Sequence, residues 1–136
     1  MSEIENTLAL IKDEFSIFSD PRDKYVYLVD LAKDMRGLNE DERIEENRIH
    51  GCTSQAWVIK KLSGKNYFFT TDSDAMIVKG LLSLIERSFN GHTKEEILNI
   101  NGSLFLESIG LGSAISSQRT NGFSNAIHKI QNELLD

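Results

Sequence analysis

The stretch AWVIKKLSGKNYFF, residues 56–69, decides the fold class that we expect for this chain. It contains two short apolar runs, AWVI and YFF, whose aromatic and β-branched residues favour strands over helices. Between the runs, residues 63–66 supply the glycine and the small polar residues of a tight turn. The stretch therefore predicts an antiparallel hairpin, and the preceding segment 44–50 is a candidate third strand.

Helical patterns flank the predicted hairpin on both sides. An opening helix covers residues 4–15, a second begins at Pro21 behind Asp20 and stops at Gly37, and another closes the chain. Residues 75–85 are apolar around most of a helix, which predicts that this helix is central. The expected buried stripes of the other three helices are Ile4, Leu8, Ile11 and Phe15, then Tyr25, Leu28, Val29, Ala32 and Met35, then Phe123, Ala126, Ile127, Ile130 and Leu134.

Capping residues mark the ends of the later helices. Residues 72–74 offer two aspartates and a serine as caps for the central helix, and Asn90-Gly91 is a natural stop. Thr93 and Glu96 form a capping box for a short helix, and a further helical turn is expected at 104–109. Together these elements predict an α+β fold, a small antiparallel sheet packed against several helices.

Composition narrows the class of protein. The 136 residues suffice for one buried core, and we expect a single domain over residues 1–136. Hydrophobic residues make up 40% and charged residues 26%, which is ordinary for a folded, soluble chain. With a net charge of −6 and no basic cluster, the sequence favours a protein partner over nucleic acid. The N-terminus lacks a signal-like apolar run, so we expect a cytoplasmic protein without membrane contact.

The single cysteine, Cys52, lies in the stretch IHGCTSQAW between two predicted strands. Gly51 before it permits backbone conformations that other residues resist, and a loop can be exposed and mobile. The thiolate is the nucleophile, so Cys52 needs a cation or backbone amides nearby; His50 and Ser54 are the polar side chains within the motif that flank it. The alternative is that Cys52 is a small core residue, because free cysteines are often buried.

Other uses of a cysteine have less support in the sequence. A cysteine hydrolase needs a neighbouring histidine, and His50, His92 and His128 all lack a supporting local context. A structural zinc or iron–sulfur site uses several thiolates or a close thiolate–histidine set, which one cysteine cannot supply. The glycine spacing of a phosphate-binding loop is also missing. We therefore expect neither a metal nor a cofactor in this chain.

Three motifs, in this order, resemble the SufE family of sulfur-acceptor proteins. They are GCTSQAW at residues 51–57, DSDAMIVKGL at 72–81 and SSQRTNG at 116–122. The resemblance extends from the stretch DPRDKYVYLVDLAK to the C-terminal helix and implies the SufE fold, which is also seen in IscU-type scaffolds. The third motif departs from the family, which commonly has Ser or Thr directly before the arginine, where this chain has Gln118.

The resemblance implies a function for the thiol. Cys52 would take persulfide sulfur from a pyridoxal-phosphate cysteine desulfurase of the SufS or CsdA kind, stimulate that enzyme, and pass the sulfur to an iron–sulfur scaffold complex of the SufBCD kind. One mobile cysteine is enough for thiol exchange, because a thiolate attacks sulfur directly. Pyridoxal phosphate would belong to the partner. The choice between the SufE branch and the related CsdE branch stays open.

The resemblance also implies roles for residues around the thiol. Arg119 would be the cation near the loop, easing thiolate formation or pairing with the desulfurase; otherwise it is an ordinary arginine at a helix start. Gly51, Ser54 and Asp74 would bind the partner or support the loop, although Asp74 can equally be a helix cap. Trp57 is expected to be a core residue. Two other function classes remain: an interaction module that modulates a partner without carrying sulfur, and a cysteine hydrolase.

Overall fold

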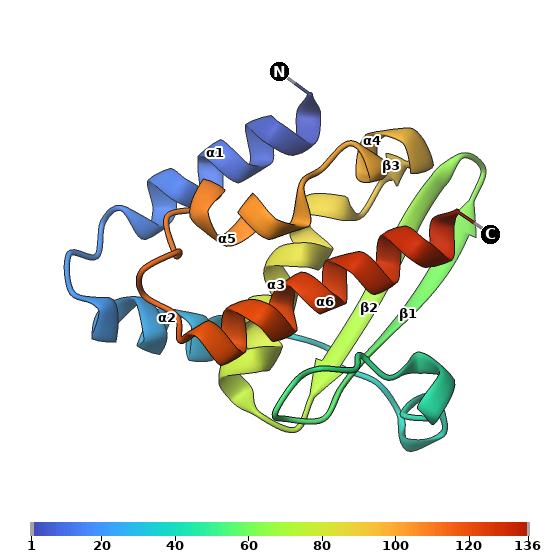
Figure 1. The fold of residues 1–136 in the computed structure, drawn as a ribbon, viewed down its shortest axis with the longest axis horizontal. Helices are drawn as coiled ribbons and strands as arrows, with labels where there is room; N and C mark the ends of the chain where they lie inside the picture. Colours follow the sequence, from blue (N-terminus) through green and yellow to red (C-terminus); the bar gives the residue numbers. More distant parts are fainter. Residues whose placement is uncertain (1, 136) are drawn as a thin grey trace.

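The computed structural model describes residues 2–135, and its centre is a small antiparallel sheet covered by helices (Figure 1). β1 (Ala56–Ser63) and β2 (Asn66–Ser73) form the predicted hairpin, and β2 also pairs with the short β3 (His92–Thr93), giving the order β1-β2-β3. The α+β fold class is therefore confirmed.

The third strand is not where the sequence placed it. Residues 44–50 contain a 3-10 helix, η2 (Glu45–Asn47), followed by a single bridge between Arg48 and Trp57. A second 3-10 helix, η1 (Glu40–Glu42), precedes it, and the Asn47 side chain donates a hydrogen bond to the Glu42 carbonyl. These local bonds hold the segment in consecutive turns, so only its last residues reach β1. The prediction of a strand at 44–50 is wrong.

The hairpin is exposed at its turn and buried at its open end. Ser63 pairs with Asn66 at the exposed turn, whereas Ala56 pairs with Ser73 and Trp57 with Asp72 at the buried end. Trp57 is buried, as predicted. The strand β1 therefore starts in the core, within the cysteine motif at Ala56, and runs outward into solvent.

Two helices open the chain. In α1 (Glu3–Phe15) the predicted stripe is fully confirmed, since Ile4, Leu8, Ile11 and Phe15 are all buried. α2 (Pro21–Lys33) begins where the sequence indicates, and the Asp20 carboxylate accepts a hydrogen bond from the backbone N–H of Arg22. The stripe of α2 is only partly buried: Leu28 and Ala32 are in the core, but Tyr25 is 41% exposed.

α3 (Met76–Phe89) is the central helix, packed against both α2 and β2. Its N-cap is Ala75, which makes no side-chain capping bond, so none of the predicted caps at residues 72–74 occupies that position. Asn90 is the C-cap, and Gly91 follows with φ +83°, which confirms the predicted stop. At Gly80, an added Cβ would lie 2.1 Å from the Leu28 carbonyl oxygen, which shows how closely α2 and α3 pack.

The last third of the chain is helical. Thr93 and Glu96 form the predicted capping box of α4 (Lys94–Leu98), and η3 (Gly102–Leu104) with α5 (Phe105–Ser108) supplies the predicted turn. α6 (Ser117–Leu134) crosses the molecule beside the sheet (Figure 1) and buries its whole predicted stripe. No helix within residues 2–135 is long and apolar enough to cross a membrane.

Candidate functional site

The cysteine motif forms a loop, residues 49–55, whose two ends are fixed to the base of the hairpin. The Ile49 N–H donates to the Ala56 carbonyl at 2.8 Å, and the Gln55 N–H donates to the Asp74 carboxylate at 3.1 Å. The Gln55 carbonyl in turn accepts from the Ser73 hydroxyl at 2.7 Å. The loop therefore has firm ends, and its tip extends towards α6.

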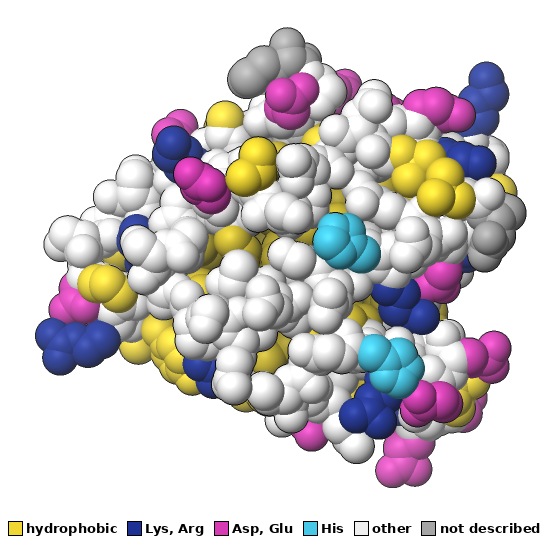
Figure 2. Space-filling model, viewed as in Figure 1, with side chains coloured by type: hydrophobic (Ala, Val, Ile, Leu, Met, Phe, Trp, Pro, Cys, Tyr) yellow, Lys and Arg dark blue, Asp and Glu magenta, His cyan; other side chains and the backbone are white. Residues whose placement is uncertain are grey.

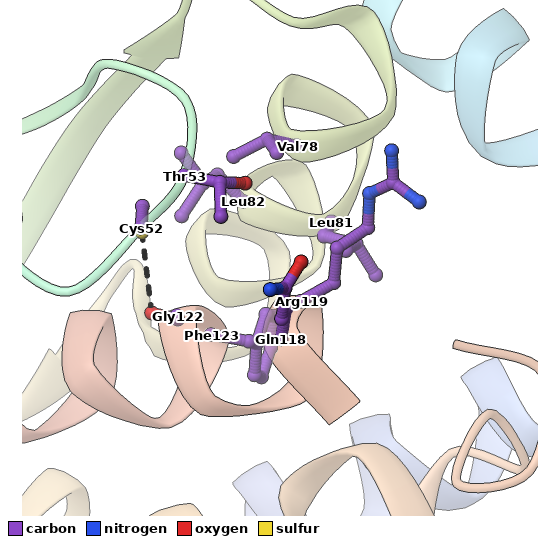
Figure 3. Close-up of a pocket in the computed structure, with 9 residues that line it drawn as sticks. All are labelled: Cys52, Thr53, Val78, Leu81, Leu82, Gln118, Arg119, Gly122 and Phe123. Atoms are coloured by element: carbon purple, nitrogen blue, oxygen red, sulfur yellow. Dashed lines mark hydrogen bonds between the residues drawn. The ribbon is translucent and has the colours of Figure 1, made fainter. Parts of the chain in front are cut away.

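Gly51 and Cys52 form the tip of this loop. Gly51 has φ +87°, in the left-handed region that glycine adopts without strain. The half-buried Cys52 directs its thiol at the Gly122 carbonyl of α6, with 3.6 Å between sulfur and oxygen (Figure 3). A Cβ added to Gly51 would also meet the amide nitrogen of Asn125, one turn further along α6. The loop tip thus rests directly on this helix.

The thiol lines a small, mostly apolar pocket between the loop, α3 and the first turns of α6 (Figure 3). Each of the three motifs singled out in the sequence contributes to its wall, although they are far apart in the chain. The lining residues are Cys52, Thr53, Val78, Leu81, Leu82, Gln118, Arg119, Gly122 and Phe123. Folding therefore gathers the three motifs around one sulfur atom.

Burial raises the pKa of the Cys52 thiol, and the positive charge of Arg48 offsets this only in part. Arg119 lies on the pocket wall, but its guanidinium is above the Tyr25 ring, 5.8 Å from the ring centroid. The sequence alone does not predict a role for Arg48. The one feature that could have indicated it is a basic residue four positions before the cysteine. In the position observed here, Cys52 is a protonated and partly sheltered thiol near neutral pH.

The gathering of the three motifs around the thiol agrees with the similarity of this chain to known proteins. The family described as "SufE: Fe-S metabolism associated domain" matches residues 9–134. The chain belongs to the SufE family. It is 34% identical over 131 residues to an "Uncharacterized SufE-like protein" of Rhizobium etli, covering 93% of this chain and 88% of that protein. It is 32% identical over 128 residues to a protein of the same description from Synechocystis, covering 94% and 80%.

A solved structure shares the SufE-family fold seen here. The solution structure of a hypothetical protein from Thermus thermophilus superposes with a TM-score of 0.75, covering 97% of this chain and 93% of that one. The sequence identity is 19%, so the likeness concerns the fold. The SufE family links the chain to iron–sulfur metabolism.

Behind the loop lies a buried carboxylate, Asp72, for which the sequence predicts only a helix-capping role. Asp72 is 1% exposed and accepts hydrogen bonds from the backbone N–H groups of Leu38, at 2.8 Å, and of Ser73. Its carboxylate also pairs with Arg43 at 2.6 Å and with Lys79 at 3.5 Å. Burial raises the pKa of Asp72, but these partners outweigh it and hold the pKa below its usual value. Asp72 ties the segment before the loop to the hairpin.

The remaining predicted site residues lie around the loop. Asp74 is exposed, and its carboxylate caps the N–H of Gln55 instead of a helix end. Ser54 is half-buried within the loop, two residues after the thiol. The Asp74 carboxylate therefore contributes to the loop's attachment to the hairpin. On the face shown in Figure 2, charged side chains of both signs are scattered and form no large patch of one sign.

The geometry does not support a cysteine hydrolase. His50 pairs with Glu45 at 3.1 Å, and His92 contacts Glu96 at 3.0 Å. Within residues 2–135, the hydrogen bond found for the Cys52 thiol goes to a carbonyl and not to an imidazole. The carboxylate of Glu3 also approaches His92 and Glu96, a group that could contact a cation. Glu96 is held in place by its capping-box bonds with Thr93, so its position in that group is explained without a cation.

Proposed function

We propose that this SufE-family protein accepts sulfur on Cys52 from the persulfide of a pyridoxal-phosphate cysteine desulfurase. By accepting the sulfur it stimulates that enzyme, and it passes the sulfur on to an iron–sulfur scaffold complex in the cytoplasm. The observation that carries the proposal is the convergence of all three SufE-like motifs on one pocket that contains the single thiol. The link of the family to iron–sulfur metabolism gives the class of pathway.

The proposed chemistry needs only thiols. The Cys52 thiolate attacks the outer sulfur of the donor persulfide, a new S–S bond forms at Cys52, and the donor S–S bond breaks. The donor cysteine leaves as a thiolate and takes up a proton. An acceptor thiolate then attacks the outer sulfur on Cys52 in the same way. Pyridoxal phosphate acts only inside the partner, where the persulfide is generated.

The docked position of Cys52 suits a carrier between two reactions. A thiol with a raised pKa that lies against α6 is a poor nucleophile and a poor target for oxidants. For sulfur to be accepted, the tip must leave α6 so that the sulfur is solvated and reaches the donor. The ends of the loop stay attached to the hairpin, so the tip can move without disturbing the core.

We assign supporting roles to the polar residues at the site. Asp74 and Ser54 hold or flank the loop, and Gly51 provides the backbone conformation at its tip. Arg119 lies on the pocket wall with its guanidinium directed away from the sulfur towards Tyr25. Contact with the desulfurase is therefore the better of its two proposed roles. The acidic balance of the chain favours a basic surface on that partner.

Mass spectrometry after incubation with a desulfurase and cysteine tests the proposal. The parent protein should gain one sulfur atom on Cys52, and the Cys52→Ser variant should gain none. The variant should still bind the desulfurase, since interfaces draw their energy from a cluster of contacts. It should fail to accelerate sulfide release when a thiol reductant is present.

Two results would contradict the proposal. If Cys52→Ser still accelerates the desulfurase, the protein is an interaction module that acts without carrying sulfur. If Cys52→Ser loses substantial thermal stability, Cys52 serves as a core residue. Because Cys52 is half-buried and packs against the hydrophobic core, this stability measurement is needed beside the activity assay.

A further inference from the structure

Gly122 is an unusual residue for its position in the fold. It is buried within α6, past the first turn, where glycine is less favourable than alanine because of its greater backbone freedom. Its φ is not positive, so the backbone conformation does not require glycine. The reason for a glycine here must lie in the space around its Cα.

That space is occupied by Cys52. A Cβ added at Gly122 would lie 2.9 Å from the Cys52 sulfur, 3.4 Å from its Cα and 3.6 Å from its Cβ. Real Cβ atoms essentially never approach other atoms as closely as 2.9 Å, so the Cys52 sulfur would have to leave this position, by rotation of its side chain or by movement of the loop. The sulfur also lies 3.6 Å from the Gly122 carbonyl oxygen (Figure 3). The thiol therefore rests in the space that a side chain at residue 122 would fill.

We propose that Gly122 is a positioning residue whose lack of a side chain lets the Cys52 loop dock against α6, and that this contact sets how often the thiol is exposed. Docked, the sulfur is desolvated and protonated. Undocked, it is solvated and ionises as an ordinary thiol. The balance between these two positions then determines how protected and how reactive Cys52 is.

The functional role of this balance between docked and undocked positions rests on the proposed sulfur transfer. The contact between Gly122 and Cys52 does not depend on that function. A carrier needs a docked position for protection and an undocked position for attack. A larger residue at 122 would shift the balance towards the undocked position, at the expense of protection. A thiol with no role in transfer would show the same shift in the isolated protein.

Alkylation of the isolated protein by iodoacetamide, measured as a function of pH, tests the contact. Gly122→Ala should be alkylated several-fold faster than the parent at neutral pH, with the midpoint of its pH–rate curve shifted to lower pH. Asn121→Ala is the matched control, because it is an exposed change at the preceding position of the same helix. It should match the parent in both rate and midpoint. Equal rates and midpoints for Gly122→Ala and the parent would overturn the proposal.

A thermal double-mutant cycle keeps the proposal testable if Gly122→Ala folds poorly. In a Cys52→Ala background the sulfur is absent, so Gly122→Ala should raise the melting temperature through its better helix propensity. In the parent background the same change should raise it less or lower it. Non-additivity of the two changes measures their contact. An equal rise in both backgrounds would mean that Cys52 and Gly122 do not interact.

Both measurements use the chain alone, so they are independent of any desulfurase. If Gly122→Ala frees the thiol but mass spectrometry finds no sulfur on Cys52 after desulfurase treatment, the positioning role holds and the sulfur-acceptor function fails. If the parent accepts sulfur while the alkylation rate is unchanged by Gly122→Ala, the function holds and the positioning role fails.

Discussion

The two ends of strand β1 are each approached through a glycine with positive φ, but the two glycines have different surroundings. Gly64, in the hairpin turn, has φ +63° and nothing within 4 Å of the point where a Cβ would lie. Gly51, before the strand, has φ +87° and lies against Asn125 of α6. The turn needs glycine only for its backbone shape. The cysteine loop needs it for shape and for close contact with a helix.

The same contrast appears in how the two ends are held. The turn end is exposed and is held by strand pairing, whereas the open end is buried beside the Asp72 cluster, which is Asp72 with its partners Leu38, Arg43 and Lys79. Just beyond that buried end, the loop tip is held by a weak thiol–carbonyl contact. Regions that move in function are drawn from the less stable parts of a fold. Here a weakly held tip is attached to a buried, hydrogen-bonded end of the hairpin.

The largest effect on stability should come from removing charge at the firm end. Asp72→Asn leaves Arg43 and Lys79 without their carboxylate partner and places a neutral amide at 1% exposure. Removing one partner of a buried ion pair destabilises a protein by about 3–5 kcal/mol. We expect a loss of about 3 kcal/mol here, because Arg43 is partly exposed. Urea unfolding of both proteins measures this loss.

Asp74→Asn is the matched control for Asp72→Asn. Its side chain is exposed, and the amide oxygen of asparagine can still accept the hydrogen bond from Gln55. We expect a loss of less than about 0.5 kcal/mol, as for most surface changes. Equal losses for the two variants would show that the Asp72 cluster does not anchor the base of the hairpin.

Much of this architecture could be predicted from local sequence patterns. Helical stripes depend on one face being buried, and those of α1 and α6 are confirmed at every residue. The hairpin is confirmed because strand propensity and turn chemistry coincide there. The strand at 44–50 failed because local hydrogen bonds of Asn47 and Arg48 fold the segment into a 3-10 turn, while the real β3 is two residues long. Such a short strand shows no alternation to detect.

The candidate site could be predicted only in part. Cys52 and Gly51 can be predicted because the single cysteine follows a glycine in a short stretch of small polar residues, a pattern that is typical of a loop. Gly122 and Arg48 become relevant only when folding brings α6 and the end of η2 to the loop. Asp72 looked like a helix cap because an acidic residue before a helix usually is one. Its partners come from residues 38, 43 and 79, and no local pattern connects them.

A pair of glycine variants tests the contrast between the two ends of β1. Gly51→Val and Gly64→Val each force a β-branched residue into the left-handed region, which costs about 1–3 kcal/mol. Both should lose stability in urea, and Gly51→Val should lose at least as much as Gly64→Val because its side chain would also meet Asn125. Only Gly51→Val should change the rate of Cys52 alkylation and slow sulfur uptake from a desulfurase.

If the two valine variants have the same effect on the thiol, the turn and the cysteine loop do not differ in the way proposed here. Normal alkylation and sulfur uptake by folded Gly51→Val would show that the loop tip does not depend on glycine. A change of thiol reactivity in Gly64→Val would show that the turn and the loop communicate along β1.

A smaller effect on stability is expected in acid. The partners of Asp72 hold its pKa below the usual value, so the folded protein releases this proton more readily than the unfolded chain. The carboxylate therefore contributes stability above the unfolded pKa, about 3.9, and this contribution fades as the pH falls through the folded pKa. The difference in unfolding free energy between the parent and Asp72→Asn should narrow from about pH 5 downwards. A difference that stays constant with pH would contradict the charge-based account.

The smallest effect concerns the two arginines near the loop. Arg48 is the cation whose charge lowers the pKa of the thiol, so Arg48→Ala should shift the pH–rate curve of alkylation to higher pH. The shift should be modest and should shrink with added salt, because Arg48 is partly exposed and already paired with Glu45. Arg119→Ala should leave the curve in place and weaken desulfurase binding in calorimetry, because its guanidinium lies over Tyr25. A larger shift from Arg119→Ala than from Arg48→Ala would reverse the two assignments and place the activating cation on α6, one turn before the glycine on which the thiol rests.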